Sequence, residues 1–260
     1  MLHKIDKTVL AASLTVLLFT GSANANDQQA SEAVAKPSVA AQSVKPDFAA
    51  ITDVKAKKQA FFSYMLPLIE QENAAILAER EKVTALSAST ALSEQDQQWL
   101  KAIAEKYRVP NVTAYDAPFF TELLTRVDVL PPSLALAQSA NESAWGTSRF
   151  ARKGNNFFGQ WCFTRGCGIV PKARDGGAVH EVEIFPDVAA SVRSYMRNLN
   201  SHSMYQQLRD LRAGQRQKQE PVTGVLLAQG LKGYSSRGEE YIKELVAMIN
   251  FNKLQQYDTK

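Results

Sequence analysis

The stretch Ser133-Leu-Ala-Leu-Ala-Gln-Ser-Ala-Asn-Glu142-Ser-Ala-Trp-Gly146, followed by Asn155-Asn156-Phe157-Phe158-Gly159, predicts the centre of the fold. Pro131 and Pro132 favour a helix start, because proline fixes φ and lacks only an N–H that the first helical turn leaves unpaired. The small Ala and Ser side chains that follow allow neighbouring elements to pack closely on several sides. We therefore expect a buried helix that ends near Glu142.

Glu142 falls in the last turn of this expected helix. The negative end of the helix dipole and the apolar surface near Trp145 both disfavour an ionised carboxylate. A carboxyl group that stays protonated near neutral pH can serve as a general acid. The alternative for a lone glutamate at a helix end is a solvated surface residue.

Segments around and beyond Glu142 resemble a known family. The two quoted stretches resemble the signature of the glucosaminidase domain of glycoside hydrolase family 73, in its Bax-type branch, and three later segments extend the match: Phe185 to Tyr195, Leu199 to Tyr205 and Gly233 to Tyr241. The resemblance spans about residues 118–254. It implies a lysozyme-like, mainly α (α+β) fold and hydrolysis of β-1,4 bonds beside N-acetylglucosamine in peptidoglycan or related glycans.

The resemblance makes Glu142 the proton donor and raises the question of a second acid. The family that this chain resembles carries a second glutamate on the strand before a hairpin turn. This chain differs, because its residues 168–174 contain no acid. We expect Glu181 to take this place, since it lies closer to the middle of the hairpin, with Glu183 second and Asp175 third. If no second acid reaches the site, water is positioned without one, or the substrate's own 2-acetamido group attacks in its place.

Further site residues follow from the same motifs. Tyr234 is a catalytic candidate that orients the N-acetyl group, and the alternative is a loop tyrosine that fills the core. The candidates for substrate binding are Trp145, Asn155, Asn156, Phe158, Gly159 and Tyr195. We expect neither a metal nor a cofactor.

Residues 1–25 have the pattern of a secretory signal peptide. Lys4 and Lys7 precede an apolar run from Val9 to Phe19, and Ala23-Asn-Ala25 forms a small-x-small cleavage site. The run is too short to span a bilayer comfortably, so export to the periplasm or beyond is expected, with an uncleaved anchor as the alternative.

The next segments predict a flexible linker over 26–46 and a helical subdomain over 47–117, ahead of a catalytic domain at 118–254 and a tail at 255–260. In the subdomain, apolar spacing from Asp53 predicts a long helix in which Pro67 introduces a kink or break. Ser93 is expected to cap a second helix, which stops before Pro110.

A small β lobe is predicted between the two helical parts of the catalytic domain. Residues 168–173 and 178–185 alternate in polarity around Asp175-Gly-Gly177, which is a hairpin signal. Such a lobe beside a helical core forms a groove that suits a polymeric sugar.

Cys162 and Cys167 are the only cysteines. In an exported chain an even count predicts one disulfide, here at the rim of the groove. The alternatives are a cysteine nucleophile paired with His180 or His202, or a metal site built from these two histidines and the two cysteines.

The C-terminal part is predicted to contain helices over 188–199 and 204–211, an exposed loop over 212–220, a helix from Pro221 to Gly230, and a last helix. The apolar face of that last helix is formed by Tyr241, Leu245, Met248 and Ile249.

Three functions remain open at this point: an endo-β-N-acetylglucosaminidase, a lytic transglycosylase, and a non-catalytic domain that binds or scaffolds the cell wall. The net charge of +4 suits an anionic polymer but does not distinguish wall, membrane surface and nucleic acid. We expect a glycan partner rather than nucleic acid, no stable membrane anchor, and a monomer.

Overall fold

The computed structural model describes residues 44–110, 112–172, 177 and 179–258. The predicted signal peptide, most of the predicted linker and Asp175 lie outside these residues. Ser43–Lys260 form one compact unit. No helix in the described ranges is both long enough and apolar enough to cross a membrane.

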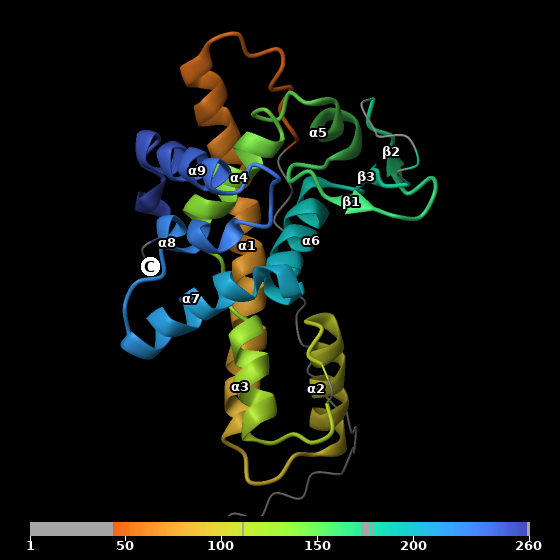
Figure 1. Ribbon diagram of the computed structural model, residues 1–260, viewed down its shortest axis with the longest axis vertical. Coiled ribbons are helices and arrows are strands. Elements are labelled where there is room, and N and C mark those ends of the chain that lie inside the picture. The colour runs from red at the N-terminus through yellow and green to blue at the C-terminus, as the bar shows by residue number, and fades with distance from the viewer. Residues whose placement is uncertain (1–43, 111, 173–176, 178, 259–260) are drawn as a thin grey trace, which may run out of the picture. The chain divides into compact units, whose positions relative to one another are not determined.

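The described chain is mainly helical (Figure 1). Its α-helices are α1 (Val54–Ser87), α2 (Glu94–Lys106), α3 (Ala117–Arg126), α4 (Pro132–Glu142), α5 (Arg149–Gly154), α6 (Val188–Ser201), α7 (Gln206–Lys218), α8 (Gly224–Ala228) and α9 (Glu239–Phe251). Three short 3₁₀ helices are η1 (Ser203–Tyr205), η2 (Gln229–Leu231) and η3 (Leu254–Tyr257). The strands β1 (Trp161–Cys162), β2 (Gly168–Ile169) and β3 (Glu181–Glu183) form one antiparallel sheet in the order β1-β3-β2. The expected mainly α fold with a small β lobe is confirmed.

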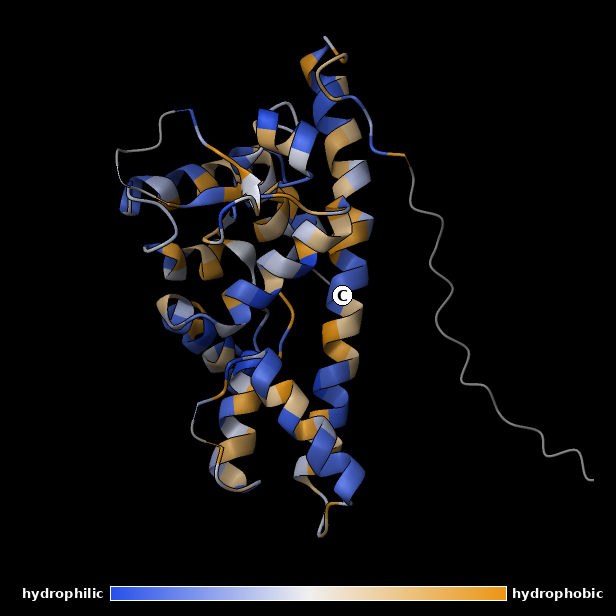
Figure 2. Cartoon of the chain, turned by 90° about the vertical axis from the view of Figure 1, so that its right-hand side faces the viewer, coloured by the Kyte–Doolittle hydropathy of each residue, from blue (hydrophilic) through white to orange (hydrophobic). Residues whose placement is uncertain are grey.

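The long helix α1 belongs to the same core as α3, α4 and α6. Apolar and polar residues alternate along it (Figure 2), and its buried side chains pack in one cluster with those of α3, α4 and α6. Of the kink or break predicted at Pro67, the break is wrong, because the helix continues from Val54 to Ser87 through Pro67. The prediction that Ser93 caps α2 is confirmed, since its side chain accepts from the N–H of Asp96.

Helix α4 lies at the centre, as its small residues predict, and all eight residues from Ser133 to Ala140 are buried. Asp258 holds its N-terminus by accepting from the N–H of Ser133 at 2.9 Å and from its hydroxyl at 2.6 Å. Gly224 packs so closely that a Cβ there would lie 2.1 Å from Ser133 Oγ. The residues predicted as a tail therefore fix the start of the central helix.

The predicted exposed loop over 212–220 is wrong, because α7 continues to Lys218. Arg212 is 1 % exposed and donates to the carbonyls of Asp128, Val129 and Thr125 and to Asn200 Oδ1. These hydrogen bonds allow the charged Arg212 side chain to be buried. A hydropathy pattern does not reveal such burial, because it counts every arginine as exposed.

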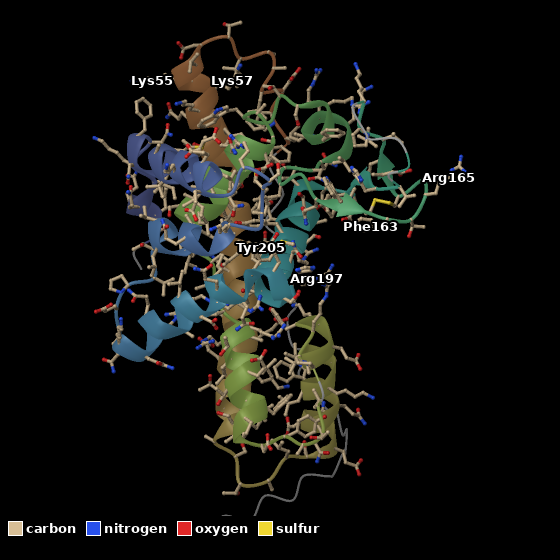
Figure 3. All side chains as sticks on the ribbon, viewed as in Figure 1. Lys55, Lys57, Phe163, Arg165, Arg197 and Tyr205 are labelled. Carbon is tan, nitrogen blue, oxygen red and sulfur yellow. A yellow bond between two sulfur atoms is a disulfide. The ribbon has the colours of Figure 1, made fainter. Side chains whose placement is uncertain are left out.

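The β lobe follows the hairpin prediction only in part. The strands are shorter than expected, the tip of the hairpin lies outside the described residues, and an additional strand, β1, pairs with β3 so that Trp161 faces Val182 and Cys162 faces Glu181. Phe163 and Arg165 project from the loop between β1 and β2 at the outer end of the lobe (Figure 3).

Candidate active site

Glu142 is the last residue of α4, in the position that the sequence predicts. The chain then reverses through three successive residues with positive φ: Ala144 (48°), Trp145 (57°) and Gly146 (76°). A Cβ at Gly146 would lie 2.3 Å from Phe48 Cδ2, so only glycine fits beneath that ring. This tight turn leaves the Glu142 carboxyl group at the open end of the helix.

A chain of side-chain hydrogen bonds orients the Glu142 carboxyl group. Tyr195 donates to Gln138 Oε1 at 2.6 Å, Gln138 Nε2 donates to the Tyr241 hydroxyl at 3.0 Å, and that hydroxyl donates to Glu142 Oε1 at 2.8 Å. Because an amide NH₂ can only donate, the single proton of Tyr241 must point to Glu142. Oε1 is thus an acceptor, and a proton on the acid belongs on Oε2.

Gly159 gives room to that second oxygen. A Cβ at Gly159 would lie 3.3 Å from Glu142 Oε2, and the residue has φ of +66°. A side chain would crowd Glu142 Oε2 and strain the backbone. Gly159 therefore keeps the space beside this oxygen free of a side chain.

The electrostatic environment favours the protonated acid. Burial raises the pKa of Glu142 above its ordinary value. The hydrogen bond from Tyr241, the charge of Arg237 and a hydrogen bond with Asn141 act in the opposite direction, and Glu244 adds to the increase. The net direction agrees with the prediction made from the helix end.

The Asn-Asn-Phe-Phe-Gly segment acts as a scaffold in this structure. Asn156 is 1 % exposed, its Nδ2 donates to the carbonyls of Gln160 and Glu183, and its Oδ1 accepts from the N–H groups of Phe158 and Gln160. Asn155 is in the left-handed region, donates to the carbonyls of Phe185 and Pro186, and accepts from Lys45 Nζ. The amides of Asn155 and Asn156 are thus engaged by the backbone and by Lys45, and their predicted contact with substrate stays a prediction.

Phe158, Tyr195 and Tyr234 form the aromatic support under Gly159. Phe158 and Tyr195, both predicted to contact substrate, are buried and stack with ring centroids 3.9 Å apart. The Tyr234 hydroxyl donates to the carbonyl of Phe158 at 2.8 Å, and its ring lies parallel to that of Tyr241. This bond engages the hydroxyl that was expected to orient an N-acetyl group, and it ties Tyr234 to the backbone next to Gly159.

Trp145 packs away from the acid onto the long helix. Its ring lies edge-on to Phe61 at 5.6 Å and Phe62 at 5.3 Å, and Lys58 Nζ lies 4.9 Å from its centroid. The indole thus anchors the turn after Glu142 to α1, and its predicted contact with substrate stays a prediction.

The comparisons with known proteins agree with this geometry. Residues 117–254 match the family described as glucosaminidase, mannosyl-glycoprotein endo-beta-N-acetylglucosaminidase. The chain is 36 % identical over 209 residues to Protein bax of Escherichia coli (strain K12), covering 80 % of this chain and 74 % of that protein. No solved structure matches the chain significantly.

The chain belongs to the glucosaminidase family. Its lysozyme-like, mainly helical fold is the one expected, and the family description indicates glycoside hydrolase chemistry on a glycan. The matched residues contain α4, the β lobe and α9, and thus every contact of Glu142 described above.

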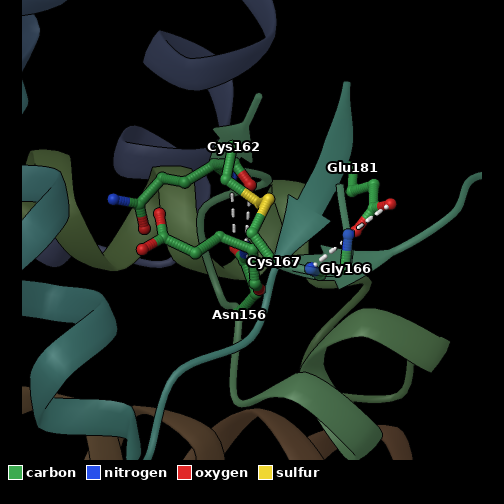
Figure 4. The surroundings of a disulfide bond; sticks show 8 residues. Asn156, Cys162, Gly166, Cys167 and Glu181 are labelled. Carbon is green, nitrogen blue, oxygen red and sulfur yellow. Dashed lines mark hydrogen bonds between the residues drawn. A yellow bond between two sulfur atoms is a disulfide. The ribbon is translucent and has the colours of Figure 1, made fainter. Parts of the chain in front are cut away.

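In this glucosaminidase domain, Cys162 and Cys167 are joined as predicted (Figure 4). Glu181 lies beside the disulfide, is 5 % exposed, and accepts from the N–H groups of Gly166 at 3.0 Å and Gly168 at 2.8 Å. Glu181, the first choice of second acid, thus has both carboxylate oxygens engaged by the backbone of the disulfide loop, and its catalytic role stays a prediction. The two sulfurs and this carboxylate lie within 4.8 Å of one another, but sulfurs bonded to each other are not thiolate ligands for a metal.

Glu183 is the other acidic residue in the described part of the β lobe. It is partly exposed, its N–H donates to the carbonyl of Gln160, and its own carbonyl accepts from Asn156. Burial raises the pKa of Glu183. The positive charge of Arg197, which lies on α6 (Figure 3), opposes this shift.

Two residues in direct contact with the site escape prediction from the sequence. Gln138 looks like an ordinary helical position, and the spacing of Tyr241 places it on an apolar face. The position of Tyr241 at the end of the Gly233–Tyr241 motif is the available signal, whereas nothing in the sequence distinguishes Gln138.

Proposed function

We propose that this protein is an exported endo-β-N-acetylglucosaminidase that cleaves β-1,4 bonds in peptidoglycan or a related glycan, with Glu142 as the general acid. One observation carries the proposal: Glu142 is partly buried, accepts a hydrogen bond on Oε1, and presents Oε2 beside a glycine. A helix-end carboxyl group without a role in proton transfer needs none of these features.

The reaction follows from that arrangement. The proton on Glu142 Oε2 passes to the glycosidic oxygen as the bond to the anomeric carbon breaks, and the departing sugar leaves as a neutral alcohol. The remaining sugar becomes oxocarbenium-like and takes up water, whose proton returns to Glu142. Tyr241 keeps the carboxyl group aligned through both steps.

Glu183 is our candidate for a second carboxylate. Its backbone is bonded to Gln160 and Asn156, so it is tied to the segment that carries Gly159. An ionised carboxylate there would stabilise the positive charge of the transition state or activate the water.

We expect Glu183→Gln to lower kcat by about tenfold or more with little change in KM, because the charge acts on the transition state. Glu181→Gln is the matched control in the same strand and should lower the melting temperature while sparing kcat per folded molecule. Steady-state rates and thermal melts of both variants test this. A wild-type kcat for Glu183→Gln would instead indicate attack by the substrate's 2-acetamido group.

Analysis of the products separates the candidate functions. Digested peptidoglycan should yield new reducing ends on N-acetylglucosamine, each product pair heavier by one water than the parent chain. Anhydro ends without added water would indicate a lytic transglycosylase. Binding to the wall without any new ends would indicate a non-catalytic domain.

Tyr241→Phe should move the alkaline limb of the kcat/KM profile to higher pH, because the lost hydrogen bond lowers the pKa of Glu142 in the wild type. The rate at the optimum should fall about tenfold, since one charge-assisted hydrogen bond aligns the acid. Tyr115→Phe is the control, because the Tyr115 hydroxyl donates to the carbonyl of Gln97. An unshifted limb in Tyr241→Phe would contradict the assigned contact.

Export is part of the proposal. The signal-like pattern of residues 1–25 supports it, and so does the disulfide between Cys162 and Cys167, because disulfides persist mainly in oxidising compartments.

A further inference from the structure

Arg237 lies one aromatic side chain away from Glu142. Its guanidinium carbon is 5.6 Å from the ring centroid of Tyr241, and the hydroxyl of that ring donates to Glu142 Oε1. Gly238, with φ of +51°, follows directly and turns the chain into α9. The loop thus delivers a fixed positive charge to the edge of the catalytic carboxyl group.

The charge of Arg237 is held in place but remains open to solvent. Its Nη2 lies 2.7 Å from Glu244 Oε2, one turn along α9 from Tyr241, and the Arg237 side chain is 52 % exposed. An exposed ion pair contributes only about 0–1 kcal/mol to stability, so stability is a weak reason for this placement. A planar guanidinium also carries more N–H donors than one carboxylate oxygen can use, and its geometry matches a further carboxylate.

We propose that Arg237 binds a carboxylate of the glycan close to the bond that Glu142 protonates, and so makes the enzyme prefer an anionic glycan. This inference rests on the proposed function. The carboxylate comes from the sugar itself, as a lactyl ether, or from a peptide attached to it. Glu244 keeps the guanidinium over Tyr241 while the outer N–H groups face the substrate.

The test compares one glycan in two charge states. Glycan strands that bear carboxylates and the same strands after chemical amidation of those groups are digested by wild type and by Arg237→Gln. For Arg237→Gln, kcat/KM should fall about tenfold on the carboxylate strands, as expected for a lost charge-assisted hydrogen bond. On the amidated strands the variant should match wild type, and Arg237→Lys should retain part of the preference.

Lys232→Gln is the matched control. Lys232 lies in the same segment, pairs with Glu239 at 3.1 Å and is 68 % exposed, so its replacement removes one similar surface charge. Strands stripped of peptide distinguish the sources: a preserved preference points to the sugar carboxylate, and a lost one points to the peptide. Equal losses for Arg237→Gln on charged and amidated strands, or equal losses for Arg237→Gln and Lys232→Gln, would overturn the inference while the proposed function stands. Absence of cleavage by wild type on both strands would overturn both.

Discussion

Glu142→Gln should lower the rate of glycan cleavage by about 100-fold or more, because the amide keeps the shape of the side chain but has no acidic proton to give. The variant should remain folded, since the carbonyl oxygen of the new amide can still accept the hydrogen bond that Tyr241 donates to Oε1. Initial rates of product release from purified peptidoglycan, with a thermal melt of each protein, measure both effects.

Glu244→Gln provides the comparison for charge alone. Glu244 raises the pKa of Glu142 without touching it in the described contacts, so its loss should move the alkaline limb of the pH profile to lower pH. Because Glu244 also pairs with Arg237, turnover is compared on amidated strands, which offer Arg237 no carboxylate. If Glu142→Gln and wild type release products equally fast, Glu142 is not the proton donor.

Asp128→Asn should lower the free energy of unfolding by about 3–5 kcal/mol, the cost of leaving a buried charge without its partner. The Asp128 side chain is 2 % exposed and lies 2.9 Å from Arg216 Nη2, 3.6 Å from Arg80 Nη1 and 3.7 Å from Arg212 Nε. Asparagine has a similar shape, so the loss reports charge rather than volume. Urea denaturation of the variant measures it.

The same cluster predicts a dependence of stability on pH. Burial alone would raise the pKa of Asp128, but Arg212, Arg216 and Arg80 outweigh it, and the pKa is lowered from its ordinary 3.8. The stabilisation is therefore fully present above that value and is lost as pH falls below it towards the lowered pKa of the folded state. Glu240→Gln is the control, because Glu240 forms an exposed pair with Lys243. Equal unfolding energies for Asp128→Asn and Glu240→Gln would contradict the account of the cluster.

The sequence predicted those features that depend on local pattern. Proline and small residues around Ser133, the last-turn position of Glu142, the capping by Ser93 and the pairing of the two cysteines all follow from spacing within a few residues. The resemblance to the family supplied the chemistry that composition alone could not.

Apart from the helix break expected at Pro67, the features that the sequence did not predict share one physical origin, which is hydrogen bonding by polar side chains to distant parts of the chain. Arg212 is buried because Asp128 and its neighbours, more than eighty residues earlier, offer carbonyls and a carboxylate. Gln138 and Tyr241 come into contact only when α4 and α9 pack together. Glu181 accepts hydrogen bonds from backbone N–H groups of the loop that the disulfide closes. Periodicity records which residues avoid water and carries no signal for such pairings.

The role of Glu142 as proton donor is tested most directly by the dependence of the rate on the leaving group. Chitobiosyl aryl glycosides with leaving groups of high and low pKa are compared in wild type and Glu142→Gln. A good leaving group departs without protonation, so the variant should lose about 100-fold on the poor leaving group and far less on the good one. The same loss on both substrates would contradict Glu142 as the general acid.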